Sequence, residues 1–225
     1  MSRLLVLTAV DLEARTLARH LGLAPVGGSV WPRFAGGAIE IIPVGTAASQ
    51  LTARLRDVPP PSLVVSAGVC GALAPELAVG ALVVPEVVIG PDGRRHSTAA
   101  VAGPRRQGIL LTTDHVLQDA AAKSRAWLET GALAVDMESS AILEWAAARA
   151  VPGLVVRAVS DPAGRGVPAD LARTVDAEGR LHPMRAVTAM LARPTALADA
   201  VALKSATTAA LKAVAAALGT LSRTV

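Results

Sequence analysis

One octapeptide carries much of the information on the architecture: Ala134-Val135-Asp136-Met137-Glu138-Ser139-Ser140-Ala141. Its apolar start ends a predicted strand over Ala132–Val135, and a helical pattern follows over Met137–Ala150. A second apolar run, Leu154–Val159, is predicted as a buried strand and ends at Ser160-Asp161. Ligands of open α/β sheets bind beyond the carboxyl ends of strands, so acids in these places are candidates for chemistry.

Outward from these segments, short apolar runs alternate with helical patterns, which is typical of an α/β fold. Further strands are predicted over Leu4–Val10, Ile39–Val44, Leu63–Ala67, Ala81–Ile89 with a break at Pro85, and Ile109–Thr112. Further helices are predicted over Asp11–Leu21 and Ala47–Arg56, with an Ala-rich helical tail over about residues 183–220. Gly68 and Gly71 are predicted in a loop, and Gly90–Gly108 as a surface loop or hairpin. The expected fold is one α/β/α domain over residues 1–225, with three layers around a central mixed, twisted sheet.

The composition excludes several classes of protein. Hydrophobic residues make up 52% of the 225 residues, which fits a compact globule. The net charge is +4, but Lys and Arg are scattered and form no basic stripe, so no nucleic-acid partner is predicted. Cys70 is the single cysteine, which excludes an intrachain disulfide and favours a reducing cytoplasm. We find no signal peptide pattern and no segment apolar enough to span a bilayer.

Common catalytic motifs are missing. The sequence has no phosphate-binding P-loop, no G-x-S-x-G elbow and no H-E-x-x-H spacing, so we predict neither a metal nor a cofactor. Cys70 is predicted as a small packed residue and the histidines as surface or structural residues. What remains is a set of carboxylates placed just after strands: Glu13, Asp114, Asp136, Glu138 and Asp161. Among these, Asp114 is predicted to cap a helix.

Four stretches together resemble the nucleoside phosphorylase/nucleosidase superfamily. Ala134–Ala141 looks like its V-[DE]-M-E-[AS]-x-A signature, and Arg157–Asp161 looks like its R-x-[IV]-S-D strand end. Ser66–Val84 resembles its Gly-rich loop and following strand, and Thr8–Glu13 its first strand and acidic helix start. The four stretches occur in the family's order, so we expect the family's fold and its cleavage of the N-glycosidic bond of purine nucleosides.

The resemblance implies a role for each site residue. Asp161 matches the general acid that protonates the leaving base, and Glu13 matches the acid that positions and deprotonates water. Glu138 matches the residue that holds the ribose hydroxyls, and Met137 would lie against the ribose. The base and the Gly-rich segment would be contacted by Gly68, Val69, Gly71, Ser160 and Asp136.

Each of the three acids also has a structural interpretation. Glu13 could be a solvated acid in the first turn of a helix, stabilised by the helix dipole. Glu138 could pair with an arginine on a helix face. Asp161 could cap the turn before Pro162.

Two positions favour water over phosphate as the nucleophile. Where phosphorylases of the family hold phosphate with an arginine and a hydroxyl, this chain has Val69 and Ser66. Arg15, Arg33 or Arg94 could still reach the site, so phosphorolysis stays as the alternative. A nucleoside sensor without turnover is a second alternative, and a nucleic-acid glycosylase is a third, disfavoured by the missing basic groove.

The sequence departs at two places from the commonest members of the family, and both departures bear on the identity of the substrate. Thr112–Val116 lacks the stacking phenylalanine of many methylthioadenosine/S-adenosylhomocysteine nucleosidases, and Pro162-Ala163-Gly164 follows Asp161. Thr130–Ser139, Asp176–Arg180 and Leu191–Pro194 resemble hopanoid-associated members, which remove adenine from a nucleoside carrying a polycyclic lipid. A small-molecule nucleoside is the expected partner, and the tail could touch a membrane surface or be an ordinary packed helix. The family also implies a homodimer in which a neighbouring subunit completes the 5′ side of the pocket.

Overall fold

The computed structural model describes residues 3–165 and 196–224. Three predictions fall wholly or partly on residues 166–195: the motifs Asp176–Arg180 and Leu191–Pro194 and the first part of the helical tail. They lie outside the described residues.

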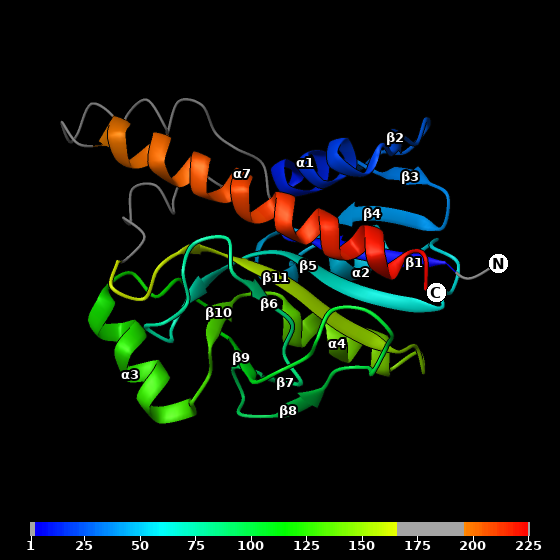
Figure 1. Ribbon diagram of the computed structural model, residues 1–225. Coiled ribbons are helices and arrows are strands. Elements are labelled where there is room, and N and C mark those ends of the chain that lie inside the picture. Colours follow the sequence, from blue (N-terminus) through cyan, green and yellow to red (C-terminus); the bar gives the residue numbers. More distant parts are fainter. Residues whose placement is uncertain (1–2, 166–195, 225) are drawn as a thin grey trace.

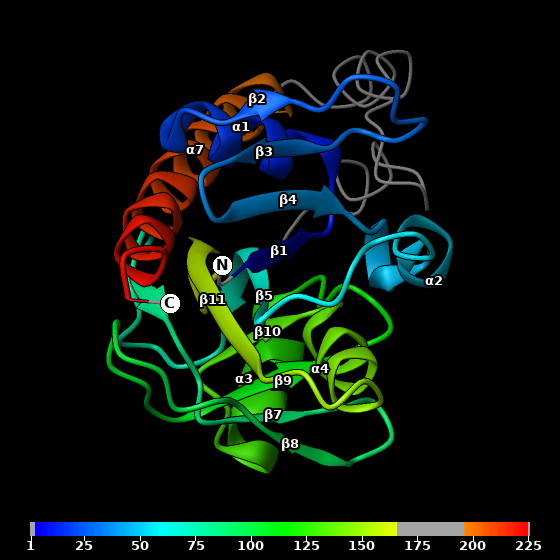
Figure 2. The same cartoon turned by 90° about the vertical axis from the view of Figure 1, so that its right-hand side faces the viewer.

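The described part of the chain is built around one mixed sheet of eleven strands (Figures 1 and 2). The strands are β1 (Leu4–Thr8), β2 (Ala24–Pro25), β3 (Phe34–Gly36), β4 (Ile39–Pro43), β5 (Leu63–Ala72), β6 (Leu82–Val83), β7 (Val87–Ile89), β8 (Arg95–Ser97), β9 (Ile109–Thr112), β10 (Ala134–Asp136) and β11 (Gly153–Asp161). Their order is β2-β3-β4-β1-β5-β10-β9-β7-β8, and β11 pairs with β5 and β6. Strand β1 runs parallel to β4 and β5, whereas β10 runs antiparallel to β5. The sheet therefore branches at β5, which pairs with β1, β10 and β11.

Helices cover both faces of this sheet. They are α1 (Asp11–Leu21), α2 (Leu51–Arg54), α3 (Ala120–Thr130), α4 (Ser139–Ala147) and α7 (Ala196–Leu221), with a 3₁₀ turn at Thr46–Ala48. Strand β1 shows how the layers form, because successive side chains of a strand point to opposite faces. Leu4 and Val6 belong to the core that contains residues of α1 and α7, and Leu5 and Leu7 to the core that contains residues of α2 and α4. The predicted three-layer α/β/α fold with a mixed sheet is confirmed.

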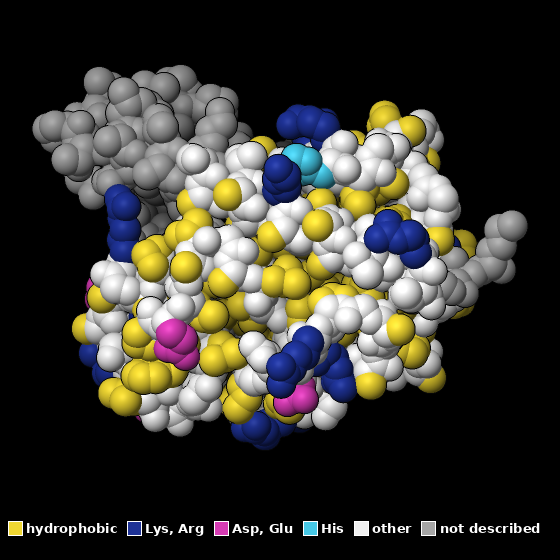
Figure 3. All heavy atoms as spheres, in the orientation of Figure 1, with side chains coloured by type: hydrophobic (Ala, Val, Ile, Leu, Met, Phe, Trp, Pro, Cys, Tyr) yellow, Lys and Arg dark blue, Asp and Glu magenta, His cyan; other side chains and the backbone are white. Residues whose placement is uncertain are grey.

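The last helix packs on the sheet through its second half. Seven of its apolar side chains are buried in the core shared with α1 and β11: Ala210, Leu211, Val214, Ala215, Ala217, Leu218 and Leu221. Among the described residues, no helix combines the length and apolarity that crossing a bilayer requires. On the face that carries α7, Lys and Arg side chains stand apart and form no continuous stripe (Figure 3).

Two segments around the site differ from the prediction. The helix predicted over Ala47–Arg56 is wrong in its first part, because Ala47 and Ala48 lie in the 3₁₀ turn with positive φ angles of 51° and 56°, and α2 begins only at Leu51. The loop predicted for Gly68 and Gly71 is also wrong, because both glycines lie inside β5 and pair with β11. In both segments tertiary contacts override the local preference of the sequence.

Other elements are confirmed or corrected one by one. The break predicted at Pro85 is confirmed, because β6 ends before it and β7 begins after it, and Gly90–Gly108 contains β8, which forms a hairpin with β7. The helix predicted over Met137–Ala150 is shorter, so Met137 and Glu138 precede α4. Asp114 is not a helix cap: the N-cap of α3 is Asp119, which accepts a hydrogen bond from the Ala122 N–H at 2.7 Å.

Candidate active site

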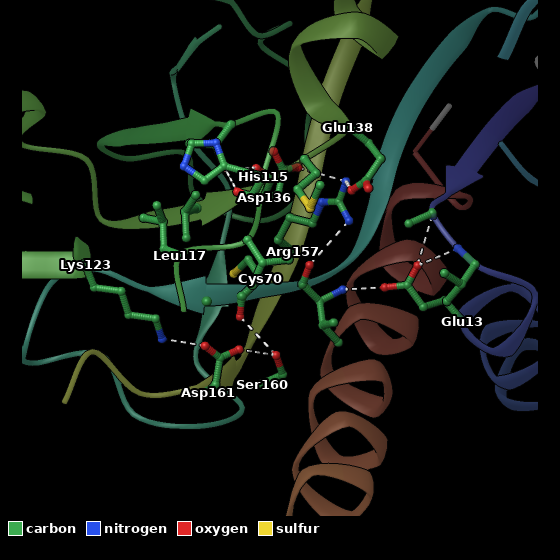
Figure 4. A pocket seen from close by; sticks show the side chains of 18 residues that line it. Glu13, Cys70, His115, Leu117, Lys123, Asp136, Glu138, Arg157, Ser160 and Asp161 are labelled. Atoms are coloured by element: carbon green, nitrogen blue, oxygen red, sulfur yellow. Dashed lines mark hydrogen bonds and ion pairs between the residues drawn. The ribbon is translucent and has the colours of Figure 1, made fainter. Parts of the chain in front are cut away.

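A pocket of about 250 Å³ opens where β1, β10 and β11 end beside the last third of β5. Of the residues proposed from the sequence, eight line it: Glu13, Val69, Gly71, Asp136, Met137, Glu138, Ser160 and Asp161. Gly68 lies behind the wall of the pocket. Figure 4 shows Glu13 and Asp161 on opposite sides, with Arg157 between them. The strand ends thus gather the predicted acids, with the exception of Asp114, which is exposed.

Glu13 is held by backbone amides at the start of α1. Its Oε2 accepts hydrogen bonds from the N–H groups of Ala9 at 3.0 Å and Val10 at 3.3 Å, and its Oε1 accepts one from Val69 at 2.9 Å. The residue is only 3% exposed, so the interpretation of Glu13 as a solvated helix acid is wrong. Burial raises its pKa above the usual value for glutamate, although Arg157 and the three amides oppose the rise.

Gly68 leaves the space in which Glu13 and Arg157 approach β5. Its φ is +149°, and a Cβ at this position would lie 2.4 Å from Glu13 Oε1 and 2.8 Å from Arg157 Nη1. Any other residue would push both charged groups out of place. Gly68 therefore shapes the site without lining it.

Arg157 is a site residue to which the sequence assigned no role. It lies in the middle of β11, is 1% exposed, and its Nη2 contacts Asp136 Oδ2 at 2.8 Å and Glu138 Oε2 at 3.3 Å. The same nitrogen donates to Ser66 Oγ at 3.0 Å. Burial acts to lower the pKa of Arg157, but the nearby carboxylates outweigh it and raise the pKa above its ordinary value. Its charge inside an otherwise apolar strand was the signal that could have identified it.

Asp136 faces the protein as much as the pocket. Its Oδ1 accepts a hydrogen bond from Thr112 Oγ1 at 2.8 Å, and its Oδ2 accepts one from Ser139 Oγ besides the ion pair with Arg157. Both oxygens are thus bound by protein groups. Asp136 holds Arg157 in place, and its contact with the base stays a prediction.

Glu138 precedes α4 and is 5% exposed, with Met137 beside it in the pocket wall. Its Oε1 accepts a hydrogen bond from the Ala47 N–H at 3.1 Å, which gives the unusual backbone of Ala47 a purpose. Burial raises the pKa of Glu138 to about 7, against the attraction of Arg157. Of the arrangements expected for Glu138, pairing with an arginine is observed, but inside the pocket and not on a helix face.

Asp161 ends β11 at the other side of the pocket. Its Oδ1 accepts a hydrogen bond from Ser160 Oγ at 2.7 Å, and its Oδ2 contacts Lys123 Nζ at 2.5 Å. Lys123 comes from α3 and was not identified from the sequence, where it lies in an Ala-rich segment with no distinguishing motif. A Cβ on Gly71 would lie 2.9 Å from Asp161 Oδ2, so this glycine makes room for the carboxylate.

Three arginines considered as phosphate ligands lie outside the pocket, whereas Cys70 and His115 line it. Arg33 pairs with Glu40 and Arg94 with Asp92, Arg15 lies over the ring of Phe34, and none of the three arginines lines the pocket. Cys70 is buried, as predicted, and burial raises the pKa of its thiol. His115 does line the pocket, where its exposed ring pairs with Asp114. Within residues 3–165 and 196–224, no group of His, Cys, Asp and Glu could hold a metal ion.

This chain is similar to known proteins both in sequence and in fold. The sequence model of the family described as Phosphorylase superfamily matches residues 95–192. Futalosine hydrolase of Streptomyces coelicolor is 33% identical over 233 residues, covering 80% of this chain and 95% of that protein. The 5′-methylthioadenosine/S-adenosylhomocysteine nucleosidase of Mycobacterium bovis is 39% identical over 83 residues, covering 35% of this chain and 32% of that protein.

Two solved structures extend the likeness to the whole chain. The nucleosidase of the same name from Neisseria meningitidis has a TM-score of 0.71 at 15% identity and covers 100% of both chains. Futalosine hydrolase of Helicobacter pylori has a TM-score of 0.67 at 18% identity and covers 98% of this chain and 97% of its own. With a third of its residues shared with one relative over most of both sequences, the chain belongs to the phosphorylase superfamily.

Proposed function

We propose that this enzyme hydrolyses the N-glycosidic bond of a 5′-modified purine nucleoside of the adenosine type and releases the free base. The enzyme is a nucleosidase, as are the named relatives. One observation carries the choice of water as the nucleophile. The Val69 N–H, which is the only donor that valine offers to a phosphate, already donates to Glu13 Oε1.

The charges of the pocket support the same choice. Four carboxyl groups and two cationic side chains line it among the described residues: Glu13, Asp136, Glu138 and Asp161, with Lys123 and Arg157. Arg157 already pairs with Asp136 and Glu138, and Lys123 with Asp161. A phosphate dianion needs a cation that is not already neutralised in a desolvated pocket. Water needs only a base, and burial raises the pKa of Glu13, which makes its carboxylate a stronger base than that of a solvated glutamate.

The remaining residues fit the two sides of the sugar. In our proposal Glu138 accepts hydrogen bonds from the ribose hydroxyls, and these bonds strengthen as positive charge develops on the sugar. Asp161 protonates the departing base, and its position opposite Glu13 across the pocket supports this role (Figure 4). An acid and a base on opposite sides of a sugar resemble the arrangement of inverting glycoside hydrolysis.

The identity of the 5′ group is open to a direct test. The relatives are named for futalosine and for methylthioadenosine with S-adenosylhomocysteine, so these nucleosides are the first candidates. A nucleoside with a polycyclic lipid at the 5′ position stays a prediction from the sequence. So do the homodimer, the cytoplasmic location and a weak contact with a membrane surface.

The test is release of free base from a panel of nucleosides, measured by chromatography with and without phosphate. The panel contains adenosine, inosine, methylthioadenosine, S-adenosylhomocysteine, futalosine and a 5′-alkylated adenosine. We expect phosphate-independent release that is fastest with one 5′-substituted member. Release that requires phosphate and yields ribose 1-phosphate would replace hydrolysis by phosphorolysis. Binding without release from any member would favour the sensor.

A further inference from the structure

Lys123 is the most unusual side chain of helix α3. Its neighbours Ser124 and Arg125 are exposed, whereas Lys123 is 1% exposed. An ammonium group is costly to bury unless it is paired and hydrogen-bonded. Nζ pairs with Asp161 Oδ2 at 2.5 Å and donates hydrogen bonds to the carbonyl oxygens of Pro162 at 3.0 Å and Arg165 at 2.9 Å.

The partners of Lys123 are all at or just after the end of β11. The ammonium therefore joins α3 to Asp161 and to the segment that follows it in the chain. Three acceptors use the three N–H bonds of the ammonium. The geometry fixes Nζ against one oxygen of Asp161, at the wall of the pocket that Lys123 also lines.

Both carboxylate oxygens of Asp161 accept a hydrogen bond from a protein side chain. Oδ1 accepts from Ser160 Oγ at 2.7 Å and Oδ2 from Lys123. The role proposed for Asp161 is to give a proton to the departing base, so that proton must first reach the carboxylate. A serine hydroxyl is a very weak acid, whereas an ammonium beside a carboxylate in a poorly solvated site can transfer its proton. Lys123 is the one ammonium among the side chains that line the pocket.

We infer that Lys123 is a positioning residue that holds Asp161 and supplies the proton which Asp161 passes to the leaving base. The inference rests on the proposed function. An N–H bond of Lys123 breaks as an O–H bond forms at Asp161 Oδ2. That O–H bond then breaks as an N–H bond forms on the base, while the C1′–N bond breaks and its electron pair goes to the base. Water adds its oxygen to C1′ and gives one proton to Glu13. Glu13 then releases that proton to solvent, and the neutral amine of Lys123 regains a proton from solvent, so the cycle closes with no net change in protons.

The test compares variants with the wild type as a function of pH. Lys123→Gln keeps a donor for Asp161 but has no proton to give, and Lys123→Met removes both. Arg125→Met, on the exposed side of the same helix, is the matched control for loss of a positive charge. kcat and KM are measured from pH 5 to pH 9 on the nucleoside that the wild type cleaves, and folding is checked by thermal melting.

We expect kcat of both Lys123 variants to fall by roughly 10²-fold at pH 8, with KM changed far less. The deficit relative to wild type should shrink toward pH 5, where solvent can protonate Asp161 directly. A deficit that is the same at every pH, or none at all, overturns the inference.

A second measurement covers the case in which a variant folds poorly. Because Lys123 acts through Asp161, Lys123→Gln should cause little further loss of kcat when added to Asp161→Asn. Independent, multiplying losses would contradict the inference. Absence of turnover by the wild type would instead contradict the proposed function, so the two failures are distinct.

Discussion

The two sides of the pocket each place an acid beside a cation, but the two cations differ in kind. On one side Glu13 lies near Arg157, which also contacts Asp136 and Glu138. On the other side Asp161 is paired with Lys123. A guanidinium keeps its charge under all ordinary conditions, whereas a buried ammonium can lose a proton.

This difference matches what the proposed reaction requires of each side. In that reaction water loses a proton to Glu13, and a neighbouring cation that cannot itself donate a proton leaves Glu13 free to accept one. The base gains a proton, which in our inference comes from the ammonium beside Asp161. The proposed reaction thus assigns proton acceptance to one side and proton donation to the other, and variants on each side can test the assignment.

The largest effect is expected on the donating side. Asp161→Asn keeps the size of the side chain but has no acidic proton, so kcat should fall by roughly 10²–10⁴-fold. Nucleoside binding, measured by calorimetry, should largely survive because the ribose contacts of Glu138 remain. A variant that retains most of its turnover would remove Asp161 from the role of general acid.

A smaller loss is expected on the accepting side. Glu13→Ala removes the base but leaves water in the pocket, so kcat should fall by roughly 10²-fold. Added formate can take the place of the missing carboxylate and should restore part of the rate. Unchanged kcat, or a loss that formate leaves untouched in a well-folded variant, would contradict the assignment of Glu13 as the base.

The smallest effect concerns stability and involves Glu138. Its pKa is raised from 4.5 to about 7 in the folded state, so the protonated form is favoured by folding. Its contribution to stability is therefore present below pH 4.5 and is lost as pH rises through about 7. In Glu138→Gln this loss should disappear, so the melting temperature should decline less between pH 5 and pH 8, by at least ~2 °C. Parallel melting curves for variant and wild type would show that Glu138 does not titrate in this way.

Much of the fold could be predicted because buried strands leave a clear pattern. The apolar runs beginning at Leu4, Leu63 and Leu154 are all central strands, and Glu13 and Asp161, which follow the first and the last of these runs, line the pocket. The 3₁₀ turn with a positive φ angle at Ala47 could not be predicted. Alanine has a high intrinsic preference for helix. The reason for the non-helical backbone is the hydrogen bond from the Ala47 N–H to the carboxylate of Glu138, which is distant in the sequence.

The two cationic side chains of the site, Arg157 and Lys123, also show how far a local sequence pattern can predict a site. Arg157 carried a local signal, since a charge in the middle of a buried strand needs partners. Lys123 carried none, because its partner Asp161 is 38 residues away and a lysine among alanines is typical of an exposed helix. Burial of a charge depends on what the fold brings to it, and that information is not local.

The hydrogen bond from the Val69 N–H to Glu13 also determines which substitutions could convert this enzyme into a phosphorylase. Replacing Val69 with arginine would place a cation next to Glu13, where the two side chains would neutralise each other. A phosphorylase made from this scaffold would need the carboxylate of Glu13 removed, so that the Val69 amide is free, and a new cation that the existing acids cannot reach. The hydrolytic character of the site is thus a property of two coupled positions, and a single substitution should not reverse it.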